Sequence, residues 1–173
     1  MNAAKRIAFV LACLLAVSLL AGCAAKSKYP TDNAYHAETD CQFSWYSNMG
    51  TRIFAETPEG YYALLHQCVL HYIDKKTMEP IPVCAKPNCL HNDQSCDAYF
   101  NGIDCSVDFV DGKLYVTAQG KPGIDDPGRT LLMEVAPDGS QRKTLISYPA
   151  SPLDYKRRVI HRGYFYRATA DYD

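Results

Sequence analysis

The chain has 173 residues, of which 47% are hydrophobic and 21% are charged, with 18 basic and 19 acidic side chains. This composition is typical of a globular domain with a real core and excludes a disordered polar chain. No basic stripe or patch accompanies the formal net charge of −1, so we expect no nucleic-acid partner.

The first 22 residues are predicted to be an export signal. Lys5 and Arg6 form a short positive region, and an apolar run follows from Ile7 to Leu20. This run is too short for a comfortable membrane span and has the layout of a helical secretory signal peptide. Removal of Lys5 and Arg6 with the signal leaves 16 basic against 19 acidic residues.

The signal ends in Leu20-Ala-Gly-Cys23, which resembles the lipobox of bacterial lipoproteins. The resemblance implies that a diacylglycerol group is attached to the Cys23 sulfur and that cleavage occurs just before this residue. Two acyl chains suffice for stable anchoring. We therefore expect a mature protein lipid-anchored at Cys23 on the extracytoplasmic face of the cell membrane. The alternative is a plain secretory signal in which the cysteine is incidental.

Residues 23–49 are polar, show no sustained apolar period, and are predicted to be a flexible tether. The folded part is predicted to span residues 50–173. Its clearest signal is a β-hairpin from Val107 to Val116, in which Asp111-Gly112 suits a two-residue type I′ turn with positive φ at both positions.

Weaker copies of this hairpin surround Gly60 and Gly163, which are 52 and 51 residues from Gly112. A repeat near 50 residues built from short strands indicates β-propeller blades. The chain is therefore predicted to be all-β, with four-stranded antiparallel blade repeats that form about two and a half blades of a partial β-propeller. The predicted units are blade 1 at 50–84, a Cys-rich crossover at 84–104, blade 2 at 105–147 and an incomplete blade 3 at 157–173.

Such an array leaves unpaired strand edges, which natural β-proteins avoid. We therefore expect either that the natural chain continues past Asp173 or that a partner completes the sheet. A small β-sandwich, in which the likeness between the repeats is incidental, is the alternative architecture.

The predicted crossover is rich in metal ligands, with three cysteines and a histidine within thirteen residues: Cys84, Cys89, His91 and Cys96. Four such ligands suit a tetrahedral structural Zn²⁺, which would stabilise a loop that has no core of its own. The ligand spacing differs from the two-residue Cys-Cys knuckle of zinc ribbons.

The export compartment favours disulfides over a metal, because secreted proteins meet oxidising conditions. Besides Cys23, the mature chain has an even number of cysteines that fits three disulfides: Cys41, Cys68, Cys84, Cys89, Cys96 and Cys105. Thiols kept reduced in an anaerobic setting are the third possibility. None of the three makes the segment catalytic.

The same segment resembles a family of lipoproteins that is common in Gram-positive anaerobes and has no established activity. The matching residues belong to a Cys-x-Lys-Pro-x-Cys-x-His motif and a following Cys-x-Ala-Tyr-Phe motif: Cys84, Lys86, Pro87, Cys89, His91, Cys96, Ala98, Tyr99 and Phe100. The resemblance covers most of the chain from Cys23 onward and implies a lipid anchor and a β-propeller in a longer protein.

The sequence contains no Gly-x-Ser-x-Gly, His-Glu-x-x-His or EF-hand pattern. Our main hypothesis is therefore a membrane-anchored binding or scaffold lipoprotein with an extracellular glycan or protein as its ligand. The alternative is a truncated enzyme that acts on extracellular polysaccharide or peptide, with its site in missing blades. A non-functional fragment is the third possibility.

Overall fold

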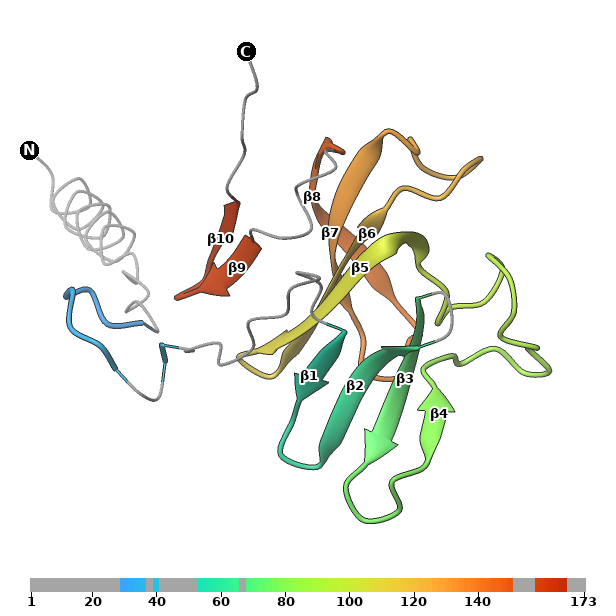
Figure 1. Ribbon diagram of the computed structural model, residues 1–173, viewed down its shortest axis with the longest axis horizontal. Coiled ribbons are helices and arrows are strands. Elements are labelled where there is room, and N and C mark those ends of the chain that lie inside the picture. The colour runs from blue at the N-terminus through green and yellow to red at the C-terminus, as the bar shows by residue number, and fades with distance from the viewer. Residues whose placement is uncertain (1–28, 37–38, 41–52, 66–67, 151–157, 168–173) are drawn as a thin grey trace, which may run out of the picture. The chain divides into compact units, whose positions relative to one another are not determined.

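The structure is a computed structural model that describes residues 29–36, 39–40, 53–65, 68–150 and 158–167 (Figure 1). The predicted export signal, Cys23 and most of the predicted tether lie outside these residues. Within them, every regular element is an antiparallel β-strand, which confirms the all-β prediction. No helix in this part of the chain is long and apolar enough to cross a membrane.

Contacts between residues divide the chain into two units, residues 1–39 and residues 40–173. The first contains a small hydrogen-bonded turn around Asp32. One carboxylate oxygen of this residue accepts a bond from the Ala34 backbone NH at 3.0 Å and another from His36 Nε2 at 2.7 Å. All strands among the described residues belong to the second unit.

The first sheet is an antiparallel meander in which neighbours in the chain are neighbours in the sheet. Its strands are β1 (Phe54–Glu56), β2 (Gly60–Leu65), β3 (Val69–Asp74) and β4 (Pro80–Pro82). The two prolines of β4 cannot donate ladder hydrogen bonds, and β4 accordingly forms an edge of the sheet. The Asp74 carboxylate closes the turn before β4 by accepting bonds from the backbone of Lys76 and Thr77.

The second sheet repeats this meander with longer strands. They are β5 (Asn101–Val110), β6 (Lys113–Gln119), β7 (Arg129–Val135) and β8 (Arg142–Pro149). Asp111 and Gly112 connect β5 to β6 with φ values of 55° and 75°, as the type I′ prediction requires.

The predicted bounds of this second repeat were too narrow. Strand β5 begins at Asn101, inside the predicted crossover, and β8 continues to Pro149, beyond the predicted end at residue 147. The register of β5 shifts between Asn101 and Ser106, and Gly102 has a φ of 102°. This irregularity breaks the alternation by which a strand is recognised from sequence.

A third, two-stranded sheet consists of β9 (Arg158–His161) and β10 (Tyr164–Arg167). Arg162 and Gly163 connect them with φ values of 46° and 79°, so this hairpin repeats the turn at Asp111-Gly112. The incomplete third blade predicted at 157–173 would include this hairpin and stays a prediction. The last part of that predicted blade, residues 168–173, lies outside the described residues.

Gly60 differs from the other two repeat glycines. It is the first residue of β2 rather than a left-handed turn residue, and Thr57 closes the preceding turn with bonds to the Gly60 backbone. A Cβ atom at Gly60 would lie 2.6 Å from the Tyr72 ring. Close packing therefore requires a glycine at position 60, whereas a left-handed turn requires one at positions 112 and 163. The prediction that Gly60 is equivalent to the other two glycines was wrong on this point.

The two four-stranded sheets share one hydrophobic core. The first sheet contributes mainly alternate side chains of β2 and β3, among them Tyr62, Leu64 and the fully buried Leu70. The second sheet contributes alternate residues of its strands: Val107, Leu114, Val116, Ala118, Leu131, Met133 and Val135. Burial of these faces against each other is the main stabilising contribution, because each sheet alone would expose its apolar side.

The sheets also approach each other closely through their turns. Gly139, in the turn between β7 and β8, has a φ of 77° and lies against the backbone of Val83, which follows β4. A Cβ atom at Gly139 would lie 2.8 Å from the Val83 carbonyl carbon. Nearby, the Tyr62 hydroxyl donates a hydrogen bond to the Pro137 carbonyl at 3.3 Å.

We predict that Gly139→Ala destabilises the protein more than Gly112→Ala. Both glycines are left-handed, with φ values of 77° and 75°, so each alanine costs about 1–2 kcal/mol of backbone strain. Only position 139 adds a clash with Val83, worth about 1–3 kcal/mol more, because no atom lies within 4 Å of a Cβ at Gly112. Urea unfolding of both variants measures the difference; equal midpoints would show that the sheets do not pack as described.

Candidate metal centre

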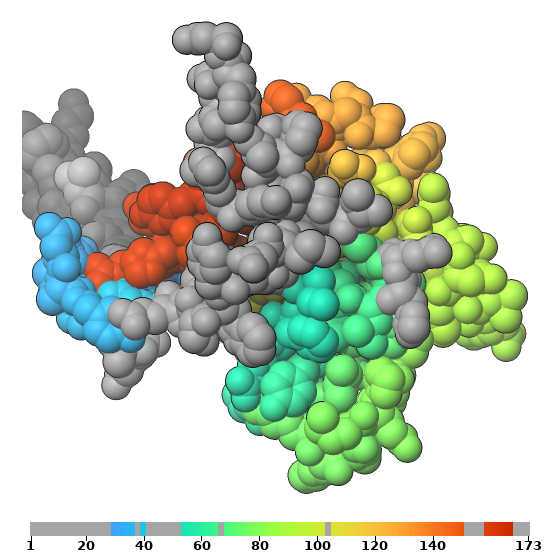
Figure 2. Space-filling view, viewed as in Figure 1, coloured from blue at the N-terminus to red at the C-terminus, as the bar shows by residue number. Residues whose placement is uncertain are grey.

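The four predicted metal ligands converge in the structure. The ligand atoms of Cys84, Cys89, His91 and Cys96 all lie within 4.8 Å of one another. His91 Nδ1 lies 3.3 Å from Cys96 Sγ, and Cys96 is buried while the other three are half-buried. The segment that carries them, coloured yellow-green, lies at the right-hand margin of the visible face in Figure 2.

Tight turns bring the ligands together. Asn88 and His91 have left-handed φ values of 58° and 56°, so the chain reverses sharply on each side of Leu90. The Asp93 carboxylate then accepts a bond from the Ser95 backbone NH at 2.8 Å. Short polar side chains commonly close turns in this way. The loop therefore folds around the ligand atoms without regular secondary structure.

The loop is attached to the first sheet at its C-terminal end. The Ala98 carbonyl accepts a hydrogen bond from the Leu70 backbone NH at 2.8 Å, and Tyr99 forms an isolated bridge with Val69. Val69, Cys96 and Ala98 form a small buried cluster of their own. The Ala98 backbone NH also donates to Cys96 Sγ at 3.2 Å, which is the kind of outer contact that orients a thiolate ligand.

The three thiols influence one another's ionisation. Burial opposes ionisation of Cys84, yet the backbone NH groups of Lys86 and Asp97 and the thiols of Cys96 and Cys89 outweigh it and lower the Cys84 pKa. Burial and the neighbouring thiols raise the pKa of Cys96 to about 11, although the hydrogen bond from the Ala98 backbone NH acts to lower it. A bound cation would offset the burial that opposes ionisation of Cys96.

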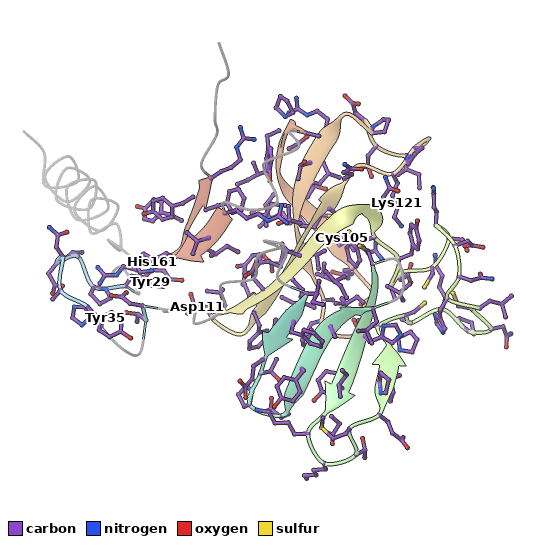
Figure 3. The ribbon with its side chains drawn as sticks, viewed as in Figure 1. Tyr29, Tyr35, Cys105, Asp111, Lys121 and His161 are labelled. Atoms are coloured by element: carbon purple, nitrogen blue, oxygen red, sulfur yellow. The ribbon has the colours of Figure 1, made fainter. Side chains whose placement is uncertain are left out.

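Cationic side chains surround the cluster. Lys86 forms an ion pair with Asp97 at 2.9 Å and donates a hydrogen bond to the Ser95 carbonyl. Lys121, from the loop after β6, donates to the Gln94 carbonyl at 3.1 Å. Burial, together with the charge of Arg142, lowers the pKa of Lys121 to about 8. Figure 3 labels Lys121 on this side of the molecule.

Arg142 extends from β8 of the second sheet toward the cluster. Its guanidinium lies over the Phe100 ring at 4.1 Å and donates to the Tyr99 carbonyl at 3.0 Å. Burial lowers the pKa of Arg142, while the negative charges of Asp97, Cys96 and Cys84 oppose this effect. Its buried Nη2 has no hydrogen-bond partner among the described residues. An anionic metal centre beside the Arg142 guanidinium would compensate its positive charge.

The residues present fit a zinc ion. Three thiolates and one neutral imidazole give a zinc centre a net charge of −1, which complements Arg142 and Lys86. Ligand atoms on a tetrahedral zinc lie about 3.5–3.8 Å apart, so the observed cluster needs only small side-chain rotations to close on the ion. The cluster can therefore hold a metal such as Zn²⁺, in agreement with the sequence prediction.

The alternative of three disulfides needs Cys41 and stays a prediction. The five cysteines in the described part of the chain carry no disulfide, and Cys41 lies outside it. Three of the five belong to the cluster, whereas Cys68 and Cys105 lie elsewhere. The sequence did not reveal Arg142 or Lys121 as neighbours of the cluster, because both reach it from the second sheet.

A groove lies between the turns of the two sheets. It has a volume of about 550 Å³ and is lined by the rings of Tyr62, Tyr72 and Phe109, with the acidic residues Glu59 and Asp138. The ring centroids of Tyr62 and Tyr72 are 5.2 Å apart. Burial raises the pKa of Tyr62, which keeps its hydroxyl protonated as a donor to Pro137.

We predict that Arg142 stabilises the metal loop in two ways, by packing on Phe100 and by compensating the negative charge of the metal centre. Arg142→Lys keeps the positive charge but loses the planar guanidinium that lies over the Phe100 ring. This variant should lower the free energy of unfolding by about 1–2 kcal/mol and leave the zinc affinity nearly unchanged. Arg142→Met should also weaken zinc binding about tenfold or more. Competition with a chromophoric chelator measures the affinity, and Lys143→Met on the same strand is the exposed control. Equal affinity of Arg142→Met and the control would contradict charge compensation.

Comparison with known proteins adds no relative to this picture: no protein-family model, no curated protein and no solved structure matches the chain. The lipoprotein resemblance therefore rests on the motif residues themselves.

Proposed function

We propose that this chain is a binding or scaffold lipoprotein, anchored through Cys23 on the extracytoplasmic face of the cell membrane. In this proposal a structural zinc ion fixes the crossing between two propeller-like blades. One observation carries it: the ligand atoms of Cys84, Cys89, His91 and Cys96 lie within 4.8 Å of one another at that crossing.

The donor set supports a structural rather than a catalytic zinc. Catalytic zinc ions keep one position open for water or substrate, whereas four protein ligands fill a tetrahedral site. The loop around the cluster has little apolar burial of its own beyond Val69, Cys96 and Ala98. A metal bound there would supply the stability that this short loop lacks.

The strand order supports blades. Each of the first two sheets is a four-stranded antiparallel meander, and the chain passes directly from the edge of one to the edge of the next. Blades of a propeller are built in this way and pack face to face. The hairpin of β9 and β10 would begin a third blade, with Phe165 6.2 Å from the Tyr148 ring of the second sheet.

The aromatic groove supports a binding role. Its rings offer flat apolar faces, and Glu59 and Asp138 offer acceptors for hydroxyl or amine donors. Such a lining suits an extracellular glycan or a protein segment. No observation among the described residues favours the enzyme alternative.

We predict that Cys89→Ser abolishes stoichiometric zinc binding. The native chain, purified with zinc, should contain about one ion per chain, and the variant close to none, because three remaining ligands bind zinc weakly. The variant should also unfold at a lower temperature. Elemental analysis and thermal unfolding measure both effects, with Cys68→Ser as the control outside the cluster. Equal zinc contents in the native protein and Cys89→Ser would refute the metal site.

We predict that Cys23→Ser abolishes lipid attachment, because only a thiol can form the thioether. Expressed in a bacterial host with labelled palmitate, the native chain should incorporate label and sediment with membranes. The Cys23→Ser variant should do neither. Cys13→Ser, within the signal itself, is the matched control and should behave as the native chain. Label in Cys23→Ser would contradict the proposed anchor.

A further inference from the structure

Two cysteines outside the metal cluster direct their thiols to the same atom. Cys68 Sγ donates a hydrogen bond to the Gly102 carbonyl oxygen at 2.9 Å, and Cys105 Sγ donates to the same oxygen at 3.3 Å. Cys105 Sγ also donates to the Asn101 carbonyl at 3.3 Å. Two sulfurs that donate to one oxygen at 2.9 and 3.3 Å are neighbours, separated by no more than the sum of these distances.

The backbone holds this arrangement in place. Cys68 precedes β3 with a left-handed φ of 64°, and its carbonyl accepts a hydrogen bond from the Phe100 backbone NH at 3.0 Å. Cys105 lies within the irregular start of β5, where the register shift turns its side chain back toward residues 101 and 102. Figure 3 labels Cys105 on this strand. The two thiols therefore belong to different sheets and meet where the sheets join.

These thiols are distinct from the metal ligands. Cys68 and Cys105 pack with the core shared by the two sheets, whereas the cluster cysteines pack with Val69 and Ala98. The pair also differs in access, since Cys105 is only 1% exposed and Cys68 is half-buried. An external reagent would therefore reach Cys68 first.

We propose that Cys68 and Cys105 form a thiol–disulfide exchange site that an external disulfide oxidises to a covalent link between the two sheets. The Cys68 thiolate attacks one sulfur of the oxidant, and a mixed disulfide forms as one thiolate leaves. The Cys105 thiolate then attacks Cys68 Sγ and displaces the second thiolate. Two protein thiols are oxidised, the oxidant is reduced to two thiols, and the two protons pass to the leaving thiolates.

This link has a structural consequence that the metal does not supply. It closes a ring of chain from residue 68 to residue 105, which contains β3, β4 and the whole metal loop. Constraining so long a segment restricts the unfolded chain and favours the folded one. The oxidised protein should therefore unfold at a higher denaturant concentration than the reduced protein, with zinc present in both.

The test uses the full chain loaded with zinc, so that the cluster thiols are protected. The reduced protein is treated with oxidised glutathione, the remaining thiols are alkylated, and the chain is cleaved after aromatic residues. Phe100 and Phe109 bracket Cys105, and Tyr62 and Tyr72 bracket Cys68, so each lies in its own fragment. We expect one linked pair of these fragments, lighter by two hydrogen atoms and separated again by reductant.

Controls distinguish this pair from other cysteines. The linked fragments should vanish in Cys68→Ser and should persist in Lys143→Met, an exposed substitution on β8 that leaves every cysteine and every metal ligand in place. Separate alkylation of Cys68 and Cys105 in the oxidised native chain would overturn the proposal, as would stable glutathione adducts on either residue. Linkage of either residue to Cys41 or to a cluster cysteine would overturn it as well. The result in the native chain decides the question even if a variant fails to fold.

Discussion

The structure depends on one constraint: the apolar faces of the two four-stranded sheets cover each other in one shared core. Along β6 the side chains of Leu114, Val116 and Ala118 point to this shared core, and Leu70 meets them from β3. Because protein interiors are close-packed, the turns that border the core have little freedom. Gly139 can therefore approach the Val83 backbone only without a side chain.

The candidate metal ligands and the paired thiols gather at the connection between the two sheets. The first sheet ends at the edge strand β4 and the second begins at the edge strand β5, so the connecting chain must cross between them. The candidate metal cluster occupies this crossing, and the thiols of Cys68 and Cys105 meet at its end. Metal binding and disulfide formation would act at the same junction, on different cysteines and under different conditions. Both would stabilise the connection between Val83 and Phe100, two residues that are buried in the shared core.

Local patterns in the sequence predicted some elements well and missed others for physical reasons. The Asp111-Gly112 turn was predicted correctly, since two positive φ values within a hairpin depend on the turn residues themselves. The start of β5 was missed because a bulge interrupts its alternation. Gly60 was read as a turn glycine, whereas the Tyr72 ring above it excludes a side chain. That contact is invisible until β2 and β3 are paired.

The sequence by itself determined the all-β class, the meander order of the strands and the four candidate ligands, because these follow from alternation, turn chemistry and residue type over short stretches. Only the tertiary structure decided which cysteines lie together. Cys84, Cys89 and Cys96 converge with His91, while Cys68, just before β3, and Cys105, in β5, both donate to the Gly102 carbonyl. It also brought Arg142 beside the cluster. Such partners are separated along the chain and are joined by the packing of whole sheets, which no local pattern encodes.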